Sequence, residues 1–230
     1  MDCIEGMKLL ADRSIDMILC DLPYGVTKNE WDTIIPFDKL WEQYERIIKD
    51  DGAIVLTANA SFTNKLINSN PKLYRYKWIW IKNNVTNFVN AQYRPMSNFE
   101  EVLIFSKGTA ASNSQLRMKY FPQGLLERMK RYRDTSNQKY ENYPKDTLHY
   151  NREPYGFHPT QKPVALFEYL VRTYTREGEL VLDNCMGSGT TAIACLNMER
   201  DYIGFETNEE YYQKALKRIE NNTTQLNLFW

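Results

Sequence analysis

Short runs rich in β-branched and aromatic residues recur along the chain and alternate, through much of it, with segments of helical apolar spacing. Six such runs lie at residues 15–20, 53–58, 76–82, 101–106, 179–183 and 201–206. Strands that alternate with helices are typical of a parallel sheet whose crossover helices cover it. The pattern predicts an α/β fold with a mostly parallel sheet and helices on both faces.

Three segments have the apolar spacing of amphipathic helices, and each starts with residues that favour a helix end. A proline stands at the start of the first two, and an asparagine followed by two acids at the start of the third. These predicted helices cover residues 37–49, 163–176 and 208–221.

The segment at residues 107–157 interrupts the alternation, because it holds several prolines and has no clear period. The chain of 230 residues, 43% hydrophobic and 25% charged, is long enough to bury one substantial core. We therefore predict one main domain, formed by residues 1–106 and 158–230, that carries residues 107–157 as an insert.

Charge is concentrated in this insert, although the net charge of the chain is zero. Between residues 107 and 152 there are ten basic and four acidic side chains, interleaved with aromatic residues. Such a segment favours contact with phosphates, but a solvated surface loop that binds nothing explains the same composition. The candidate phosphate contacts are Lys119, Arg128, Lys130, Arg131 and Arg133.

No apolar stretch reaches the roughly 18 residues of a membrane-spanning helix. The amino terminus lacks a basic segment followed by an apolar signal core. We expect a soluble, cytoplasmic protein with no membrane partner. The four cysteines form no C-x-x-C pair, which predicts free, mostly buried thiols and no metal site.

One predicted strand ends at Asp183 and leads into the glycine-rich turn Gly187-Ser188-Gly189-Thr190-Thr191, and the next strand ends at Glu206. Glycines in this turn let the backbone approach a ligand closely, and an acid such as Glu206 can accept both hydrogen bonds of a ribose diol. The arrangement predicts a nucleoside-containing cofactor. Its G-x-G-x-x-A spacing also satisfies the dinucleotide fingerprint, so this loop alone does not choose the cofactor.

Another predicted strand, residues 15–20, ends directly before Asp21-Leu22-Pro23-Tyr24. This motif places a carboxylate beside an aromatic ring. Aspartate and proline are common in ordinary turns, so these four residues alone indicate little more than a turn. Their meaning depends on the rest of the chain.

Taken together, three motifs resemble those of the amino-methylating DNA methyltransferases, which use S-adenosylmethionine and act on adenine N6 or cytosine N4. They are the D-P-P-Y-type motif Asp21-Leu22-Pro23-Tyr24, the cofactor motif Gly187-Ser188-Gly189 and the linking motif His158-Pro159-Thr160-Gln161-Lys162-Pro163. Their order is similar to that of the β group of this family. The resemblance spans nearly the whole chain and implies a Rossmann-like methyltransferase sheet with a small target-recognition insert at 107–157.

The resemblance implies that Asp21, Leu22, Pro23 and Tyr24 are catalytic, that Lys162 pairs with a carboxylate and that Glu206 holds the ribose. Many relatives have D-P-F where this chain has Asp183-Asn184-Cys185, which is expected to reshape the wall beside the cofactor. The residues it assigns to the cofactor are Asp21, Thr160, Gln161, Lys162, Asp183, Cys185, Gly187, Ser188, Gly189, Thr190, Thr191, Glu206 and Asn208.

The chemistry of an exocyclic amine explains why a carboxylate ends the strand. The amine is a poor nucleophile because its lone pair is delocalised into the ring. Acceptors at Asp21 and at the Leu22 carbonyl would take its two hydrogens and favour a pyramidal nitrogen. Pro23 stiffens the loop, and Tyr24 offers a ring face to a base that has been flipped out of the duplex.

Adenine N6 is the preferred target, because an acid leads the motif where the cytosine N4 enzymes of this family usually have serine. Cytosine C5 methylation is disfavoured, since no cysteine follows a proline. Amino methylation of RNA or of a protein glutamine, and a non-catalytic DNA-binding relative, stay open as alternatives. Double-stranded DNA is the expected partner, and the sequence leaves open a homodimer, a cognate restriction endonuclease and the recognition site.

Overall fold

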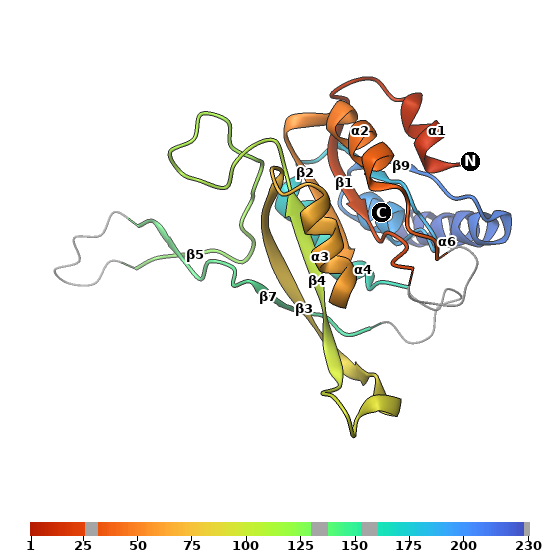
Figure 1. Cartoon of the computed structure of the whole chain (residues 1–230). Coiled ribbons are helices and arrows are strands. Elements are labelled where there is room, and N and C mark those ends of the chain that lie inside the picture. Colours follow the sequence, from red (N-terminus) through yellow and green to blue (C-terminus); the bar gives the residue numbers. More distant parts are fainter. Residues whose placement is uncertain (26–31, 130–137, 153–160, 228–230) are drawn as a thin grey trace.

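The computed structural model describes residues 1–25, 32–129, 138–152 and 161–227. Within this part of the chain, seven strands form one sheet in the order β7-β3-β4-β2-β1-β8-β9 (Figure 1). The strands are β1 (Ile15–Cys20), β2 (Ile48–Ala58), β3 (Tyr74–Thr86), β4 (Ser97–Phe105), β7 (Thr147–His149), β8 (Leu180–Asp183) and β9 (Asp201–Gly204).

Neighbouring strands in this sheet pair in parallel, except that β4 runs antiparallel to both β2 and β3. The prediction of a mostly parallel α/β sheet is confirmed. The exception has a simple cause: residues 87–96 join β3 to β4, and they are fewer than the dozen or so residues that a parallel crossover needs.

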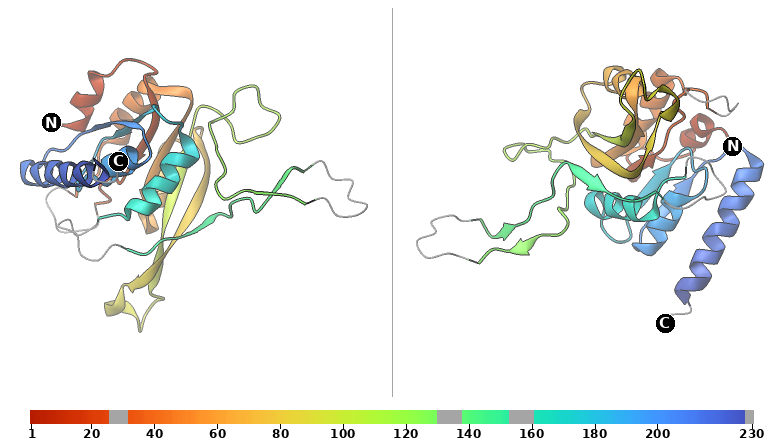
Figure 2. Two further views of the ribbon diagram at one scale, coloured as in Figure 1. Left: turned by 180° about the vertical axis from the view of Figure 1, so that it is seen from behind. Right: turned by 90° about the horizontal axis from the view of Figure 1, so that it is seen from below.

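Helices cover both faces of the sheet, as predicted (Figure 1). One face carries α1 (Cys3–Lys8), α2 (Phe37–Ile47) and α3 (Ala60–Ser69), and the other carries α4 (Val164–Tyr174) and α5 (Thr190–Asn197). The last helix, α6 (Glu209–Asn227), packs against α5 beside the β9 end of the sheet (Figure 2).

Alternate residues of the central strands enter two separate cores, because successive strand side chains point to opposite faces. Ile18 and Cys20 of β1 pack in the core under α2 and α3, whereas Met17 and Leu19 pack in the core under α4. The apolar runs of the sequence are therefore buried on both sides. Within the described residues, no helix has the length and apolarity needed to cross a lipid bilayer.

Residues 107–129 and 138–152 leave the compact body as an extended arm that carries a small sheet of β5 (Leu126–Glu127) and β6 (Tyr140–Glu141) (Figures 1 and 2). The base of the arm packs against the seven-stranded sheet. Met118 and Leu148 are buried in the core under α4, and β7 pairs in parallel with β3 at the edge of the sheet.

β1 and β8 are adjacent interior strands of the sheet, with Met17 opposite Val181 and Ile18 opposite Leu182. The loops that follow these two strands therefore meet, although more than 150 residues separate them in the sequence. This pairing positions the site described next.

Candidate active site

A cavity of about 520 Å³ opens at the carboxyl ends of β1, β8 and β9. The loop at residues 21–24 forms one part of its wall, and residues 183–188 form another. Cavities of this size hold small-molecule ligands, and this edge of an α/β sheet is where such ligands bind. The two loops singled out in the sequence thus share one cavity.

The Asp21 carboxylate is held by hydrogen bonds from three different elements. Its Oδ1 accepts from the hydroxyl of Tyr24, at 2.9 Å, and from the hydroxyl of Thr57 at the end of β2. Its Oδ2 accepts from Lys162 Nζ at 2.6 Å, so this lysine is paired with a carboxylate of the loop at residues 21–24. These contacts orient the carboxylate at the rim of the cavity.

The ring of Tyr24 is fixed by packing and by its hydroxyl. Its centroid lies 4.8 Å from that of Phe62 in α3, and Lys162 Nζ lies 5.8 Å from the Tyr24 centroid. Burial, followed by repulsion from Asp21, raises the pKa of Tyr24 well above its ordinary value. The phenol is therefore neutral and donates its hydrogen bond.

Two glycines shape the loop after β8. Gly189 has φ +75° and caps the start of α5, and Gly187 has φ +50°. Both values lie in the left-handed region that glycine adopts readily and other residues avoid. The Gly187 N–H donates to Glu206 Oε2 at 2.9 Å, so the carboxylate at the end of β9 is tied to the glycine loop.

Asp183 stiffens this loop from beneath. Its carboxylate accepts from the Cys185 N–H at 3.1 Å and from the Thr191 hydroxyl at 2.5 Å. Burial raises the pKa of Asp183 to about 6, although both hydrogen bonds act in the opposite direction. Asp183 thus supports the loop as well as facing the cavity.

Most residues that the sequence assigns to catalysis or to the cofactor line this cavity. They are Asp21, Leu22, Pro23, Tyr24, Gln161, Lys162, Asp183, Cys185, Gly187, Ser188, Thr190 and Glu206. Gly189 and Thr191 are not part of the lining. Thr160 and His158 lie outside the described residues.

Asn208 is placed differently from the expectation that it binds the cofactor. Its Oδ1 accepts from the Tyr211 N–H at 3.0 Å at the start of α6, and its N–H donates to Glu206 Oε1 at 2.8 Å. Asn208 is not part of the cavity lining. Its side chain caps the helix, which was the other role the sequence indicated.

Three polar residues of the site lie outside the motifs. Thr57 follows an apolar run in β2, Lys82 lies in β3 and Glu100 in β4, and the last two line the cavity. Glu100 Oε1 accepts from Lys82 Nζ at 2.7 Å, and its Oε2 lies 3.4 Å from Lys162 Nζ. A polar residue within the otherwise apolar run at 53–58 was the available signal for Thr57.

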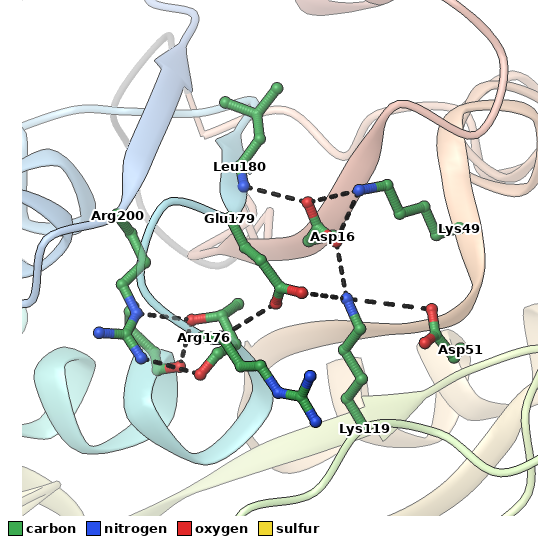
Figure 3. Close-up of polar contacts among 10 residues, drawn as sticks. Asp16, Lys49, Asp51, Lys119, Arg176, Glu179, Leu180 and Arg200 are labelled. Carbon is green, nitrogen blue, oxygen red and sulfur yellow. Dashed lines mark hydrogen bonds and ion pairs between the residues drawn. The ribbon is translucent and has the colours of Figure 1, made fainter.

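Lys119 does not lie with the other candidate phosphate contacts. Its ammonium donates to Asp16 at 2.7 Å and to Glu179 at 2.6 Å, at the end of the sheet opposite the cavity (Figure 3). Asp16 is also paired with Lys49. This placement argues against the predicted phosphate contact of Lys119, because its charge is already compensated by two acids.

Arg128 lies beside the β5–β6 pair, half-buried, and its N–H donates to the Lys139 carbonyl at 3.0 Å. Lys130, Arg131 and Arg133 lie outside the described residues. The structure therefore places Arg128 on the arm, whereas Lys119 lies against the acids at the amino ends of β1 and β8.

The cysteines are free thiols, three of them buried, and Cys185 lines the cavity. A hydrogen bond with Cys20, together with burial, raises the pKa of Cys185 well above its ordinary value. A neutral thiol is a weak nucleophile, so the site is unsuited to attack on a pyrimidine ring. The described residues contain no cluster of metal-binding side chains.

Comparison with known proteins gives relatives that match nearly the whole of this chain. The chain is 29% identical to the type II methyltransferase M.HpaI of Haemophilus parainfluenzae, over 96% of this chain and 73% of that protein. It is 26% identical to the DNA adenine methyltransferase YhdJ of Escherichia coli K12, over 95% of this chain and 81% of that protein.

Solved structures share the fold. The complex of M1.HpyAVI with S-adenosylmethionine superposes with a TM-score of 0.64 at 25% identity, covering 95% of this chain and 96% of that one. The cytosine-N4-specific PvuII DNA methyltransferase gives a TM-score of 0.72 at 18% identity, over 99% and 89% of the two chains. A sequence model of the N6/N4 DNA methylases matches residues 15–217, most of the chain, and the protein therefore belongs to this family of DNA methylases.

Proposed function

We propose that this protein transfers the methyl group of S-adenosylmethionine to N6 of an adenine that has been flipped out of double-stranded DNA. The observation that supports the proposal most is the meeting of the Asp21–Tyr24 loop with the glycine loop in one cavity. Relatives named as a DNA adenine methyltransferase and as type II methyltransferases support the substrate. The M1.HpyAVI complex supports the cofactor.

The residues around the glycine loop fit this cofactor. Gly187 presents bare backbone to the cavity, and the Glu206 carboxylate lies beside it for the ribose hydroxyls. When bound, the cofactor supplies an electrophilic methyl group on a sulfonium. Gln161, Lys162 and Cys185 border the same space and would line its methionine end.

Asp21 and the Leu22 carbonyl act on the target amine. Each accepts one N–H hydrogen, which turns the nitrogen lone pair away from the ring and toward the methyl group. After transfer the nitrogen is cationic and acidic, so an oxygen of Asp21 can take its proton without being a strong base. Tyr24 and Thr57 hold Oδ1 in place during both steps.

Cytosine N4 is the second candidate, supported by the likeness to the PvuII enzyme. That likeness is one of fold, and both targets are exocyclic amines that would sit in the same place. Adenine is favoured because an acid, Asp21, leads the motif. Methylation of RNA or of a protein glutamine is disfavoured by the names of the relatives.

The test is transfer of label from tritiated S-adenosylmethionine to unmodified plasmid DNA, with ribosomal RNA and a protein mixture as parallel acceptors. We expect label in DNA, recovered as N6-methyladenine after digestion to nucleosides. Recovery as N4-methylcytosine would select the second candidate, and label only in RNA or protein would overturn both. Single-molecule sequencing of the product gives the recognition site.

A homodimer and a cognate restriction endonuclease stay predictions. Light scattering of the purified protein with and without DNA tests the first. For the second, the expected outcome is that DNA methylated by this protein resists one sequence-specific endonuclease of the host, and cleavage of methylated and unmethylated DNA at equal rates would contradict it.

A further inference from the structure

Four acidic and basic side chains alternate along the wall of the cavity in a row of ion pairs. Lys82 Nζ lies 2.7 Å from Glu100, Glu100 lies 3.4 Å from Lys162 Nζ, and Lys162 Nζ lies 2.6 Å from Asp21. The side chains of both lysines are 7% exposed and that of Glu100 is 14% exposed. Glu100 thus connects a lysine outside the motifs to the catalytic loop.

The two carboxylates in this row, Asp21 and Glu100, differ in the number of hydrogen bonds that they accept. Asp21 accepts hydrogen bonds from Lys162, Tyr24 and Thr57. Glu100 Oε2 is buried, and no hydrogen-bond donor meets it among the described residues, although Lys162 Nζ is close by. Lys162 therefore lies between an acid that is fully engaged and one with unused acceptor capacity.

The mutual attraction of Glu100 and Lys162 favours the charged form of both side chains. Burial raises the pKa of Glu100, but attraction to Lys162 and Lys82 outweighs it and leaves the pKa below its ordinary value. Burial lowers the pKa of Lys162, but Asp21 and Glu100 outweigh it and leave the pKa raised. The buried charges therefore balance as long as Glu100 is present.

We propose that Glu100 is a positioning residue for methyl transfer, which draws the Lys162 ammonium away from Asp21 when the target amine approaches. The idea rests on the proposed function and adds to it a residue outside the three motifs. An Asp21 oxygen paired with an ammonium at 2.6 Å is a poor acceptor for an amine hydrogen. A short movement of Nζ to Glu100 Oε2 frees Asp21 Oδ2 and keeps the lysine paired.

Glu100 also affects the charge that develops during transfer. Positive charge moves to the amine nitrogen beside Asp21, and a site without Glu100 would hold two buried ammonium groups against one carboxylate. Their excess positive charge would repel the positive charge that develops on the amine nitrogen. This repulsion is strongest in a site that excludes water.

The experiment compares Glu100→Gln with Glu101→Gln in single-turnover methylation of DNA. Gln keeps the shape of Glu and removes the charge. Glu101 is a matched control, because it is the next residue of β4 and pairs with Lys77, but faces α3 through Thr63. We expect Glu100→Gln to slow transfer roughly 10- to 100-fold and to leave the Kd of S-adenosylmethionine within about twofold, with Glu101→Gln near wild type.

The double variant Lys82→Gln/Glu100→Gln separates positioning from charge balance. It restores the sum of buried charges to zero but leaves Lys162 without its second acid. We expect the double variant to stay slow. Recovery to within a few-fold of the wild-type rate would overturn the proposal, and so would an unchanged rate for Glu100→Gln.

The wild-type reaction distinguishes this inference from the proposed function. A wild-type protein that labels no DNA would overturn both. A wild-type protein that methylates DNA at the same rate as Glu100→Gln would overturn the role of Glu100 and leave the proposed function standing.

Discussion

At the scale of residues, the Asp21 carboxylate depends on partners that are distant in the sequence. Tyr24 belongs to the same loop, but Thr57 comes from the end of β2, and Lys162 precedes α4. The orientation of one side chain is thus a property of three elements of the fold. Substitution of Asp21 itself tests its chemical role most directly.

We predict that Asp21→Ala abolishes methyl transfer, because the amine loses the acceptor that aligns it and takes its proton. Binding of S-adenosylmethionine, measured by calorimetry, should survive within about tenfold, since the glycine loop and Glu206 are intact. Far-ultraviolet circular dichroism checks the fold. Unchanged activity, or loss of folding, would count against the assigned role.

At the scale of elements, the turn between β8 and α5 combines tight backbone geometry with ligand contact. Gly189 and Gly178 form a matched pair of substitution sites, which allows backbone strain to be distinguished from an effect on ligand binding. Their φ values are +75° and +73°, but a Cβ at Gly189 would lie 3.3 Å from Ile219, and one at Gly178 would meet nothing within 4 Å.

We predict that Gly178→Ala and Gly189→Ala each lower the free energy of unfolding by about 1 kcal/mol through backbone strain. Only Gly189→Ala should also weaken S-adenosylmethionine binding, because Gly189 begins the helix behind the cofactor loop. Urea unfolding and calorimetry on both variants measure the two effects. Equal cofactor affinity in the two variants would show that this turn does not contribute to the cofactor site.

Asp183 makes the stability of the same turn dependent on pH. The native state keeps a proton on Asp183 up to a pH of about 6, whereas the unfolded chain releases it near 3.8. The native state therefore binds more protons in this window, and its stability falls as the pH rises from about 4 to 6.

We predict that Asp183→Asn removes this contribution, which is on the order of 2–3 kcal/mol. The free energy of unfolding of the variant, relative to wild type, should rise between pH 4 and pH 7. Denaturant titrations at several pH values test this. A constant difference between the two proteins would contradict the shift at Asp183.

Most strands and the longer helices could be predicted from sequence, because their apolar residues have a clear period and their ends carry proline, asparagine or glycine. The run at residues 15–20 coincides with β1, and residues 37–49 contain α2. α3 was missed, since serine, threonine and asparagine with low helix propensity fill it. β7 was missed because only Leu148 of its three residues is buried.

The site, too, has residues that could be predicted from the sequence and residues that could not. Its motifs were found because glycine, proline and acids stand at strand ends, where their type is informative. Glu100 and Lys82 were not found, because a charged residue in a strand usually indicates a solvated face. Only the pairing of β3 with β4, and of β4 with β2, brings their charges to the wall of the cavity.

At the scale of the whole molecule, the described part of the arm is attached to the main sheet by a largely buried ion cluster around Lys119. Lys119 leads into the arm and binds Asp16 of β1 and Glu179 beside β8 (Figure 3). Its role is therefore attachment of the arm, whereas the basic residues farther along the arm remain the proposed phosphate contacts.

We predict that replacing Arg131 and Arg133 with alanine weakens DNA binding and flattens its dependence on salt, because fewer counterions are released. Lys119→Met is the control: it should lower the free energy of unfolding by about 1–3 kcal/mol and leave the salt slope unchanged. Fluorescence anisotropy at several salt concentrations measures both slopes. A smaller slope for Lys119→Met alone would reverse the two assignments.

The position of β1 between β2 and β8 has a consequence for the newborn chain. One neighbour, β2, follows within a few dozen residues, but the other, β8, is synthesised more than 150 residues later. At ribosomal speeds of roughly 5–20 residues per second, one flank of this apolar strand stays without its partner for about ten seconds or more. Unpaired strand edges invite association with other chains, so the interval before β8 emerges is when this protein most needs a chaperone.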